Sequence, residues 1–213
     1  GGRDLESLRA VLFAGEVFPA KYLGELMSTV PHPRYFNLYG PTETNVCTFY
    51  EVERPPAPDS APIPIGRACA NTKTLVLDAA GRPVTRPGDE GLLYVGGSNL
   101  MEGYYGRPEE TEAAFAVNPL AHGREERLYC TGDWVTTDAD GNYLFLGRRD
   151  HMVKVGGHRV ELGEIETALY SHPDVREAAA VALPDELLGG RIRAFVATSA
   201  PGPGESELLR HCR

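Results

Sequence analysis

An aromatic ring, a turn, a hydroxyl and a carboxylate fall within five consecutive residues of this chain, Tyr39-Gly40-Pro41-Thr42-Glu43. An aromatic ring can stack on the face of a nucleotide base, and a threonine hydroxyl can donate a hydrogen bond to a phosphate oxygen. A glutamate carboxylate is a hard oxygen ligand for Mg²⁺, which commonly takes one or two carboxylates together with substrate phosphates. The segment therefore predicts a nucleotide site with Tyr39 at the base, Thr42 at a phosphate and Glu43 at the metal ion.

Three further polar residues can serve the same nucleotide. Asp133 follows a Thr-Gly dipeptide at the end of an aromatic segment, and an ionised aspartate can accept hydrogen bonds from both hydroxyls of a ribose. Arg148 offers a planar fork of donors for ribose or phosphate. Asp150 is a candidate hinge, because a domain rotation needs a position that absorbs a change in φ and ψ.

Each of these residues also has an ordinary structural explanation. Tyr39 alone is typical of a core tyrosine at a strand end, and Thr42-Glu43 is typical of a helix cap. Asp133 alone fits an Asx turn. Arg148 and Asp150 fit an exposed salt bridge, which contributes little to stability.

The elements around the Tyr39–Glu43 segment predict a βαβ unit. Residues 11–14 form an apolar run suited to a buried strand, and Pro19 can open a helix that runs to about Thr29. Residues 35–39 read as the next strand, which Gly40 and Pro41 end. The candidate residues therefore lie beyond the carboxyl end of a strand, where α/β sheets usually bind ligands.

Beyond this unit, the pattern changes from connector to sheet. Residues 53–64 are proline-rich and predict an extended connector without a helix or central strand. Residues 65–147 predict a small, mostly β, barrel-like subdomain with strands at 72–77 and 92–95. One helix interrupts it, from Pro108 to about Ala116.

After Asp150 the sequence predicts the start of a small α+β domain. Residues 152–155 and 159–160 flank Gly156-Gly157, which indicates a hairpin. A helix is expected over about 162–170, and two strands are expected at 175–183 and 192–198.

Bulk properties exclude several classes of function. The chain has 213 residues and a net charge of −9, so nothing basic enough is present to neutralise a nucleic-acid backbone. No signal peptide, transit peptide or long apolar run is found, which favours a cytoplasmic protein without a membrane partner. The four cysteines show no CxxC pair and no metal-type spacing with histidine, which favours free thiols.

Taken together and in order, three segments resemble the adenylate-forming enzymes, in particular the amino-acid-activating adenylation domains of nonribosomal peptide synthesis. They are residues 37–43, residues 129–133 and residues 147–166. The wording Arg-Val-Glu-Leu-Gly-Glu-Ile-Glu at 159–166 is closer to amino-acid-activating members than to acyl-CoA ligases. Cys130 stands where the family more usually has Arg or Lys.

The resemblance implies an α/β fold plus a β-barrel-like subdomain, followed by a small mobile α+β domain. Residues 1–147 would be the C-terminal portion of the large AMP-binding domain, 148–150 the hinge, and 151–213 an incomplete small domain. The large portion would divide into an α/β part (1–52), the connector (53–64) and the β subdomain (65–147).

The resemblance also implies a chemistry that uses ATP and Mg²⁺. A carboxylate attacks the α-phosphorus to give an acyl-adenylate and pyrophosphate, and the phosphopantetheine thiol of a peptidyl carrier protein then takes the acyl group. Positioning and charge neutralisation supply most of such catalysis. Thr42 and Glu43 would be catalytic, with Glu43 on Mg²⁺ and Asp150 the hinge. The nucleotide-binding set would be Asn37, Tyr39, Gly40, Thr42, Asp133 and Arg148.

By position, five apolar residues should line the pocket for the amino-acid side chain: Leu12, Ala14, Leu38, Val46 and Cys47. An apolar lining recognises no charged or strongly polar side chain, so a small apolar amino acid is expected. The pattern resembles free-standing ligases that load L-proline onto a carrier protein. The alternative is that these residues are ordinary core.

Some family features are absent from the sequence. It has no Ser/Thr/Gly-rich phosphate loop ending in Lys, no C-terminal catalytic lysine and no aspartate to pair with a substrate ammonium. The chain is therefore expected to be an internal piece of a longer enzyme, without complete turnover alone. The alternatives are an aryl- or acyl-acid ligase of the same fold, and a non-catalytic nucleotide-binding remnant.

Overall fold

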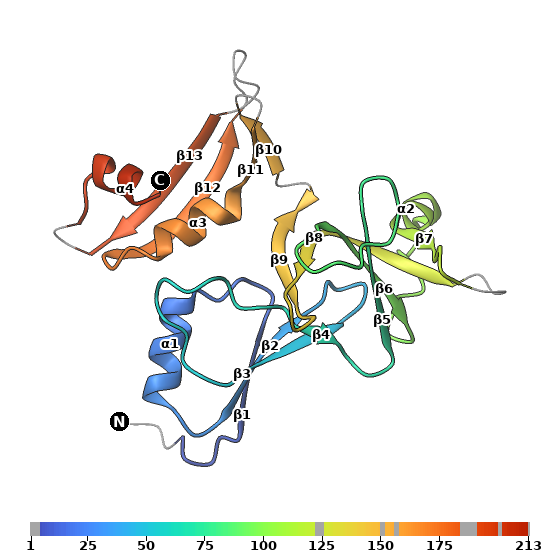
Figure 1. Cartoon of the computed structure of the whole chain (residues 1–213), viewed down its shortest axis with the longest axis horizontal. Coiled ribbons are helices and arrows are strands. Elements are labelled where there is room, and N and C mark those ends of the chain that lie inside the picture. The colour runs from blue at the N-terminus through green and yellow to red at the C-terminus, as the bar shows by residue number, and fades with distance from the viewer. Residues whose placement is uncertain are drawn as a thin grey trace. The chain divides into compact units, whose positions relative to one another are not determined.

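The computed structural model describes residues 5–121, 126–149, 152–155, 158–183, 191–199 and 202–212. The chain forms two compact units, coloured by residue number in Figure 1. Unit 1 comprises Gly1–Val17, Val30–Glu53 and Ile63–Leu146, and unit 2 comprises Phe18–Thr29, Arg54–Pro62 and Gly147–Arg213. Among the residues that the structure describes, no helix has the length and apolar character of a membrane span.

The first sheet of unit 1 has four strands in the order β1-β2-β3-β4. They are β1 (Ala10–Ala14), β2 (Arg34–Tyr39), β3 (Thr48–Val52) and β4 (Arg67–Ala68). β1 and β2 are parallel and are joined through α1 (Ala20–Thr29), which confirms the predicted strand, helix and strand. β3 then returns antiparallel to β2, so the loop after Tyr39 is a tight reversal between neighbouring strands.

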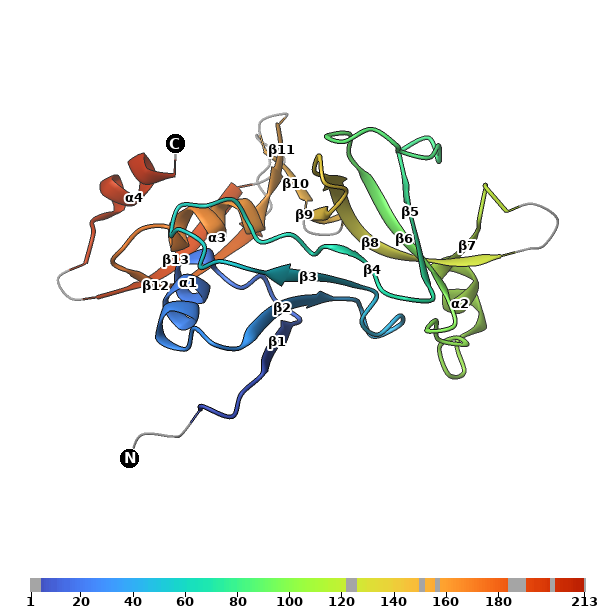
Figure 2. The same ribbon diagram turned by 60° about the horizontal axis from the view of Figure 1, so that its bottom comes forward.

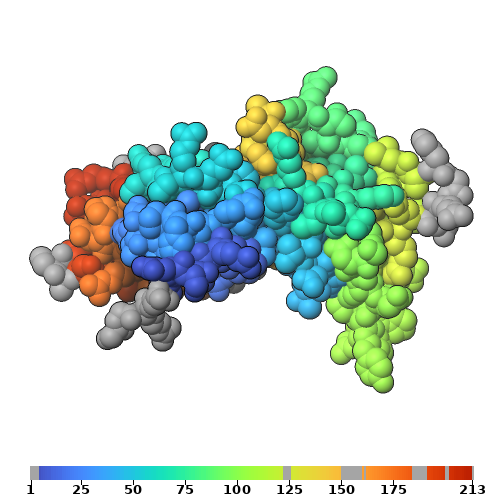
Figure 3. All heavy atoms as spheres, turned by 90° about the horizontal axis from the view of Figure 1, so that it is seen from below, coloured from blue at the N-terminus to red at the C-terminus, as the bar shows by residue number. Residues whose placement is uncertain are grey.

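The sequence predicts that the first strand is buried, and this prediction is wrong. Residues of β1 alternate between exposed and half-buried, and the Leu12 side chain is 62% exposed. The exposed side chains are the alternate ones, Ala10, Leu12 and Ala14, so none of the described residues covers this face of β1. An apolar run therefore stays at the surface, where Figure 3 shows the dark-blue N-terminal segment.

The second sheet of unit 1 lies almost entirely within residues 65–147, for which the sequence predicts a mostly β structure, and we call this part the β subdomain. Its path is β5-β6-β8-β7, with β9 also paired to β8. The strands are β5 (Thr72–Leu77), β6 (Gly91–Gly97), β7 (Phe115–Val117), β8 (Arg127–Thr137) and β9 (Tyr143–Arg148). The long strand β8 thus pairs with three others, as Figure 2 shows from a second side.

The helix inside this subdomain is shorter than predicted. Helix α2 covers Pro108–Ala114, and Phe115 already has extended backbone angles. Phe115 to Val117 pair with β8, so sheet hydrogen bonds replace the last predicted helical turn. Residues 53–64 contain neither helix nor strand, as the proline-rich sequence predicts.

The buried core of unit 1 joins the two sheets. Its members are Cys47, Ile65, Val76, Leu93, Val95 and Val135, with Tyr39 and Phe145 packed against them. Leu93 and Val95 are fully buried, and burying a side chain of this size contributes about 1.5–3 kcal/mol. Tyr39 therefore sits where the first sheet meets the β subdomain.

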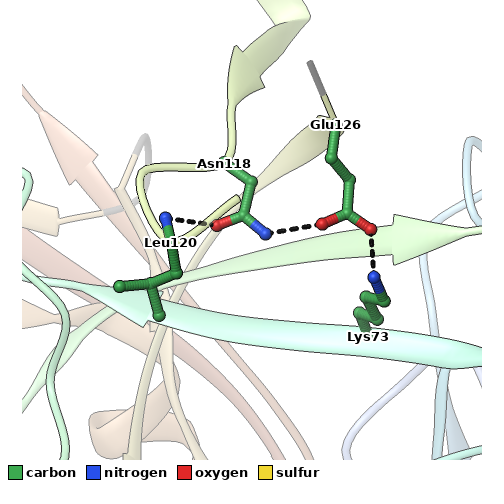
Figure 4. Close-up of polar contacts among 4 residues, drawn as sticks. All are labelled: Lys73, Asn118, Leu120 and Glu126. Atoms are coloured by element: carbon green, nitrogen blue, oxygen red, sulfur yellow. Dashed lines mark hydrogen bonds and ion pairs between the residues drawn. The ribbon is translucent and has the colours of Figure 1, made fainter. Parts of the chain in front are cut away.

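A polar cluster at the surface links β5 to the residue that precedes β8 (Figure 4). Lys73 forms an ion pair with Glu126, and Asn118 Nδ2 donates to Glu126 Oε2 at 2.7 Å. Asn118 Oδ1 accepts the Leu120 N–H at 2.9 Å. The Lys73 ammonium, with Asn118, holds the pKa of Glu126 below its usual value. Such an exposed pair fixes geometry more than it stabilises the fold.

Unit 2 contains the predicted small α+β arrangement. Its C-terminal elements are β10 (Met152–Val155), β11 (His158–Glu161), α3 (Leu162–Tyr170), β12 (Val175–Leu183), β13 (Arg191–Thr198) and α4 (Glu205–His211). The hairpin, the helix and the two strands are confirmed, whereas Gly156 and Gly157 lie outside the described residues. Helix α1 belongs to the same unit, where the Tyr22 hydroxyl donates to the Arg176 carbonyl at 3.0 Å.

Candidate nucleotide site

The loop after β2 is held in a compact reversal. The Thr44 N–H donates to the Pro41 carbonyl at 3.1 Å, and the Cys47 N–H donates to the Tyr39 carbonyl at 2.8 Å. A Cβ at Gly40 would lie 1.8 Å from the Asn45 carbonyl oxygen, so only glycine fits there. Residues 41–46 form turns that lead into β3. A helix cap at Thr42 and Glu43 is therefore excluded.

Tyr39 and Asp133 meet across the core although 94 residues separate them. The Tyr39 hydroxyl donates to Asp133 Oδ2, and the Asp133 side chain is only 4% exposed. The Tyr39 ring packs near Phe145, with 6.5 Å between ring centroids. Burial first, and then the Asp133 charge, raise the pKa of Tyr39 far above its ordinary value, so the phenol stays a donor.

The backbone around Asp133 is also fixed. The Thr131 hydroxyl donates to the Leu93 carbonyl at 2.8 Å and accepts the Asp133 N–H at 3.1 Å. Gly132, between these two residues, has a φ of 76°, a region that glycine adopts most readily. The Thr-Gly-Asp sequence thus places a buried carboxylate at a defined point on β8.

Glu43 is half-buried and has partners from the loop after β6. Its Oε1 accepts the Tyr104 hydroxyl at 2.6 Å, and its carbonyl accepts the Met101 N–H at 2.8 Å. The neighbouring Thr44 carbonyl accepts Asn99 Nδ2 at 2.8 Å. Sequence reasoning assigned no role to Tyr104 or Asn99. The Gly-Tyr pair at 103–104 was the available signal, but spacing alone does not show which loop it contacts.

The surroundings of the other predicted nucleotide residues and of the predicted hinge are as follows. Asn37 Nδ2 donates to the Pro64 carbonyl at 2.9 Å, so this side chain anchors the end of the connector. Thr42 is exposed at the tip of the loop. Arg148 ends β9 in unit 2 and is half-buried, and Asp150 lies outside the described residues.

Comparison with known proteins gives the family. Residues 1–105 match the family described as AMP-binding enzyme, and residues 164–213 match the AMP-binding enzyme C-terminal domain. This chain belongs to the AMP-binding enzymes. The predicted resemblance to adenylate-forming enzymes and the predicted fold class are confirmed.

One protein similar to this AMP-binding chain is a carrier-protein ligase. The L-proline–[L-prolyl-carrier protein] ligase of Streptomyces coelicolor is 42% identical over 210 residues, which are 97% of this chain and 38% of the relative. The chain thus spans well under half of that relative.

Two solved structures share the fold. Klebsiella oxytoca NpsA in complex with 3-hydroxyanthranilyl-AMSN has a TM-score of 0.82 at 26% identity, covering 95% of this chain and 40% of NpsA. ATP-bound MatB from Rhodopseudomonas palustris has a TM-score of 0.77 at 26% identity, covering 94% and 37%.

The predicted amino-acid pocket residues of this AMP-binding chain lie on β1, β2 and the following loop. Ala14 and Leu38 are register partners across the two parallel strands. Leu12 and Ala14 are exposed, and Leu38 and Val46 are half-buried. Cys47 is fully buried in the core, and burial raises the pKa of its thiol to about 11.

A groove of about 750 Å³ lies beside Tyr104 and α2. It is lined by Glu102, Gly103, Tyr104, Pro108, Thr111, Glu112, Phe115, Ala116, Val117 and Arg127. Its lining contains neither Tyr39 nor Asp133, but it includes Tyr104, whose hydroxyl donates to Glu43.

The carboxylate of Glu43 suits a cation that takes most of its ligands from substrate and water. Among the described residues, no group of three or more His, Cys, Asp or Glu side chains could hold a metal ion. Mg²⁺ commonly needs only one or two protein carboxylates, because substrate phosphates and water complete its shell. The single half-buried carboxylate of Glu43 fits that requirement.

Proposed function

We propose that this chain is part of an ATP-dependent ligase. The ligase activates a small apolar amino acid, for which L-proline is the best candidate, as its aminoacyl-adenylate. It then transfers the aminoacyl group to the phosphopantetheine thiol of a carrier protein. The observation that carries the proposal is the buried Tyr39–Asp133 pair beside the Glu43 loop, in a chain 42% identical to a prolyl-carrier-protein ligase.

In the first half-reaction, a carboxylate oxygen of the amino acid forms a bond to the α-phosphorus of ATP. The bond from that phosphorus to the bridging oxygen breaks, and pyrophosphate leaves. In the proposal Tyr39 stacks on adenine, and Asp133 and Arg148 bind ribose. Thr42 donates to a phosphate oxygen, a role that its exposed place on the loop supports. Glu43 would hold Mg²⁺, which neutralises phosphate charge when bound.

In the second half-reaction, the carrier thiol attacks the acyl carbon and AMP leaves. The proposed domain division serves this step: 1–147 as part of the large domain, 148–150 as hinge with Asp150, and 151–213 as part of the small mobile domain. The boundary between Leu146 and Gly147, where the chain passes from unit 1 to unit 2, supports a division near this point, although unit 2 also contains residues 18–29 and 54–62. We further propose a cytoplasmic location.

The proposed substrate rests on similarity and on an apolar lining. Leu12, Ala14, Leu38 and Val46 carry no charge that could recognise a polar side chain, whereas Cys47 is fully buried in the core. A second candidate is an aryl acid, because the structurally similar NpsA is described in complex with 3-hydroxyanthranilyl-AMSN.

The test is acid-dependent ATP–pyrophosphate exchange on the full-length gene product that contains this chain, with proteinogenic amino acids and benzoate-type acids. Exchange with proline alone supports the proposal in full. Exchange with another apolar amino acid keeps the ligase and replaces the substrate. Exchange with aryl acids only favours the second candidate, and silence with every acid contradicts a ligase.

A further inference from the structure

Two loops of unit 1, residues 40–45 and 98–104, are fastened together at Glu43 and its neighbour. The carbonyl oxygens of Glu43 and Thr44 accept hydrogen bonds from Met101 N–H and Asn99 Nδ2, each at 2.8 Å. The third hydrogen bond differs, because its acceptor is the Glu43 carboxylate and not a backbone carbonyl. The Tyr104 hydroxyl donates to Glu43 Oε1 at 2.6 Å. The backbone bonds fix where the loop lies, and the phenol fixes where the carboxylate points.

Tyr104 is itself held rigidly. Its N–H donates to Thr111 Oγ1 at 2.9 Å, and the Thr111 hydroxyl donates to the Arg107 carbonyl at 2.7 Å. A Cβ at Gly103 would lie 2.7 Å from Thr111 Cγ2, so the turn before Tyr104 packs closely on α2. A donor fixed in this way limits the rotamers of the glutamate that it binds.

We propose that Tyr104 is a positioning residue for Glu43, holding its carboxylate in one orientation so that it binds a divalent cation together with ATP. A free glutamate side chain loses rotamer entropy when it is fixed, and the Tyr104 hydrogen bond already fixes the Glu43 side chain before the cation binds. A carboxylate has about four lone-pair sites, so it can accept a phenol and still ligate a metal ion. This inference rests on the proposed function, in which Glu43 holds Mg²⁺.

The experiment measures binding, so it does not depend on turnover. The affinity of the full-length gene product for α,β-methylene-ATP is measured by calorimetry in Mg²⁺ and again in EDTA. We expect Tyr104→Phe to lower the affinity in Mg²⁺ by about 10-fold, since hydrogen bonds to charged groups contribute on that scale. The affinity in EDTA should change less than about two-fold.

Two comparisons separate positioning from a structural effect. Tyr105→Phe makes the same chemical change at the adjacent, fully exposed tyrosine and should leave both affinities unchanged. In a Glu43→Gln background, Tyr104→Phe should cost nothing more, because its effect passes through Glu43.

Several results would overturn the inference. Equal losses in Mg²⁺ and EDTA would assign Tyr104 a structural role only. An unchanged affinity in Mg²⁺ would leave the hydrogen bond without function, as would a wild-type affinity that does not respond to Mg²⁺. If the expected binding pattern holds while no acid supports exchange, the positioning role stands and the proposed ligase reaction fails.

Discussion

The phenol of Tyr39 donates a hydrogen bond to the carboxylate of Asp133 across the core of unit 1. The two residues come from the end of β2 and from the middle of β8, and Asp133 is almost completely buried. A carboxylate that already accepts one fixed donor keeps its orientation without further loss of freedom. The hydrogen bond therefore fixes Tyr39, proposed to stack on the base, and Asp133, proposed to bind ribose, relative to each other.

Replacing Tyr39 by Phe should separate stacking from this hydrogen bond. The ring stays, but the buried carboxylate loses a donor, and hydrogen bonds to charged groups contribute about 1.5–3 kcal/mol. We expect the KM for ATP in pyrophosphate exchange to rise about 10-fold or more, with a smaller change in kcat. Tyr143→Phe is the matched control, because its hydroxyl bonds Thr74 Oγ1 at 2.9 Å elsewhere in unit 1. An unchanged KM for ATP in Tyr39→Phe would refute a functional pairing.

Replacing Glu43 by Gln should affect metal-dependent chemistry more than nucleoside binding. The amide keeps the size of the side chain but loses the charge that suits Mg²⁺. We expect Mg²⁺-dependent exchange to fall by about 10²-fold, the scale typical of a lost electrostatic contact in a transition state. Adenosine affinity should stay within about two-fold. The exposed Glu102→Gln serves as control, and a parallel loss of adenosine binding would count against a metal role.

The strands and helices were largely predictable because their signals are local. The parallel pair β1 and β2, the turn at Gly40 and the hairpin strands β10 and β11 follow from apolar runs and glycine positions. The exposure of Leu12 was not predictable, because burial depends on which elements cover a strand. The short α2 illustrates the same point, since pairing of Phe115 with β8 overrode helix propensity.

The site was predictable as a set of residue types but not as a set of contacts. Tyr39, Glu43 and Asp133 were identified from chemistry and resemblance. Tyr104 and Asn99, which donate to Glu43 and to its neighbour Thr44, were not identified. Hydrogen bonds between residues far apart in the chain produce no periodic pattern in a sequence. Only the fold shows that the loop after β6 supports the loop after β2.

Replacing Gly40 by Ala should disrupt the reversal on which the site depends. The new Cβ would lie 1.8 Å from the Asn45 carbonyl oxygen and 2.9 Å from the Cys47 backbone nitrogen. Forcing an added carbon into packed backbone costs about 1–3 kcal/mol and sometimes more. We expect a lower Tm together with loss of exchange activity. Gly204→Ala, with nothing within 4 Å of the added Cβ, should keep the wild-type Tm. A Gly40→Ala protein with wild-type Tm and activity would show that the loop adapts.

The Cys47 thiol should resist alkylation in the folded protein until strongly alkaline pH. Burial raises its pKa from the ordinary 9.0 to about 11, and only the thiolate is the nucleophile. Below pH 9 the protonated thiol contributes its full share to the free energy of unfolding. This contribution is lost as the pH rises toward about 11, and it amounts to about 1.4 kcal/mol per pKa unit. Iodoacetamide labelling followed by peptide mass spectrometry should modify the exposed Cys212 at pH 8 and leave Cys47 unmodified until the protein unfolds. A Cys47→Ala variant should lose less stability than wild type between pH 9 and 11, and rapid labelling of native Cys47 at pH 8 would contradict its place in the core.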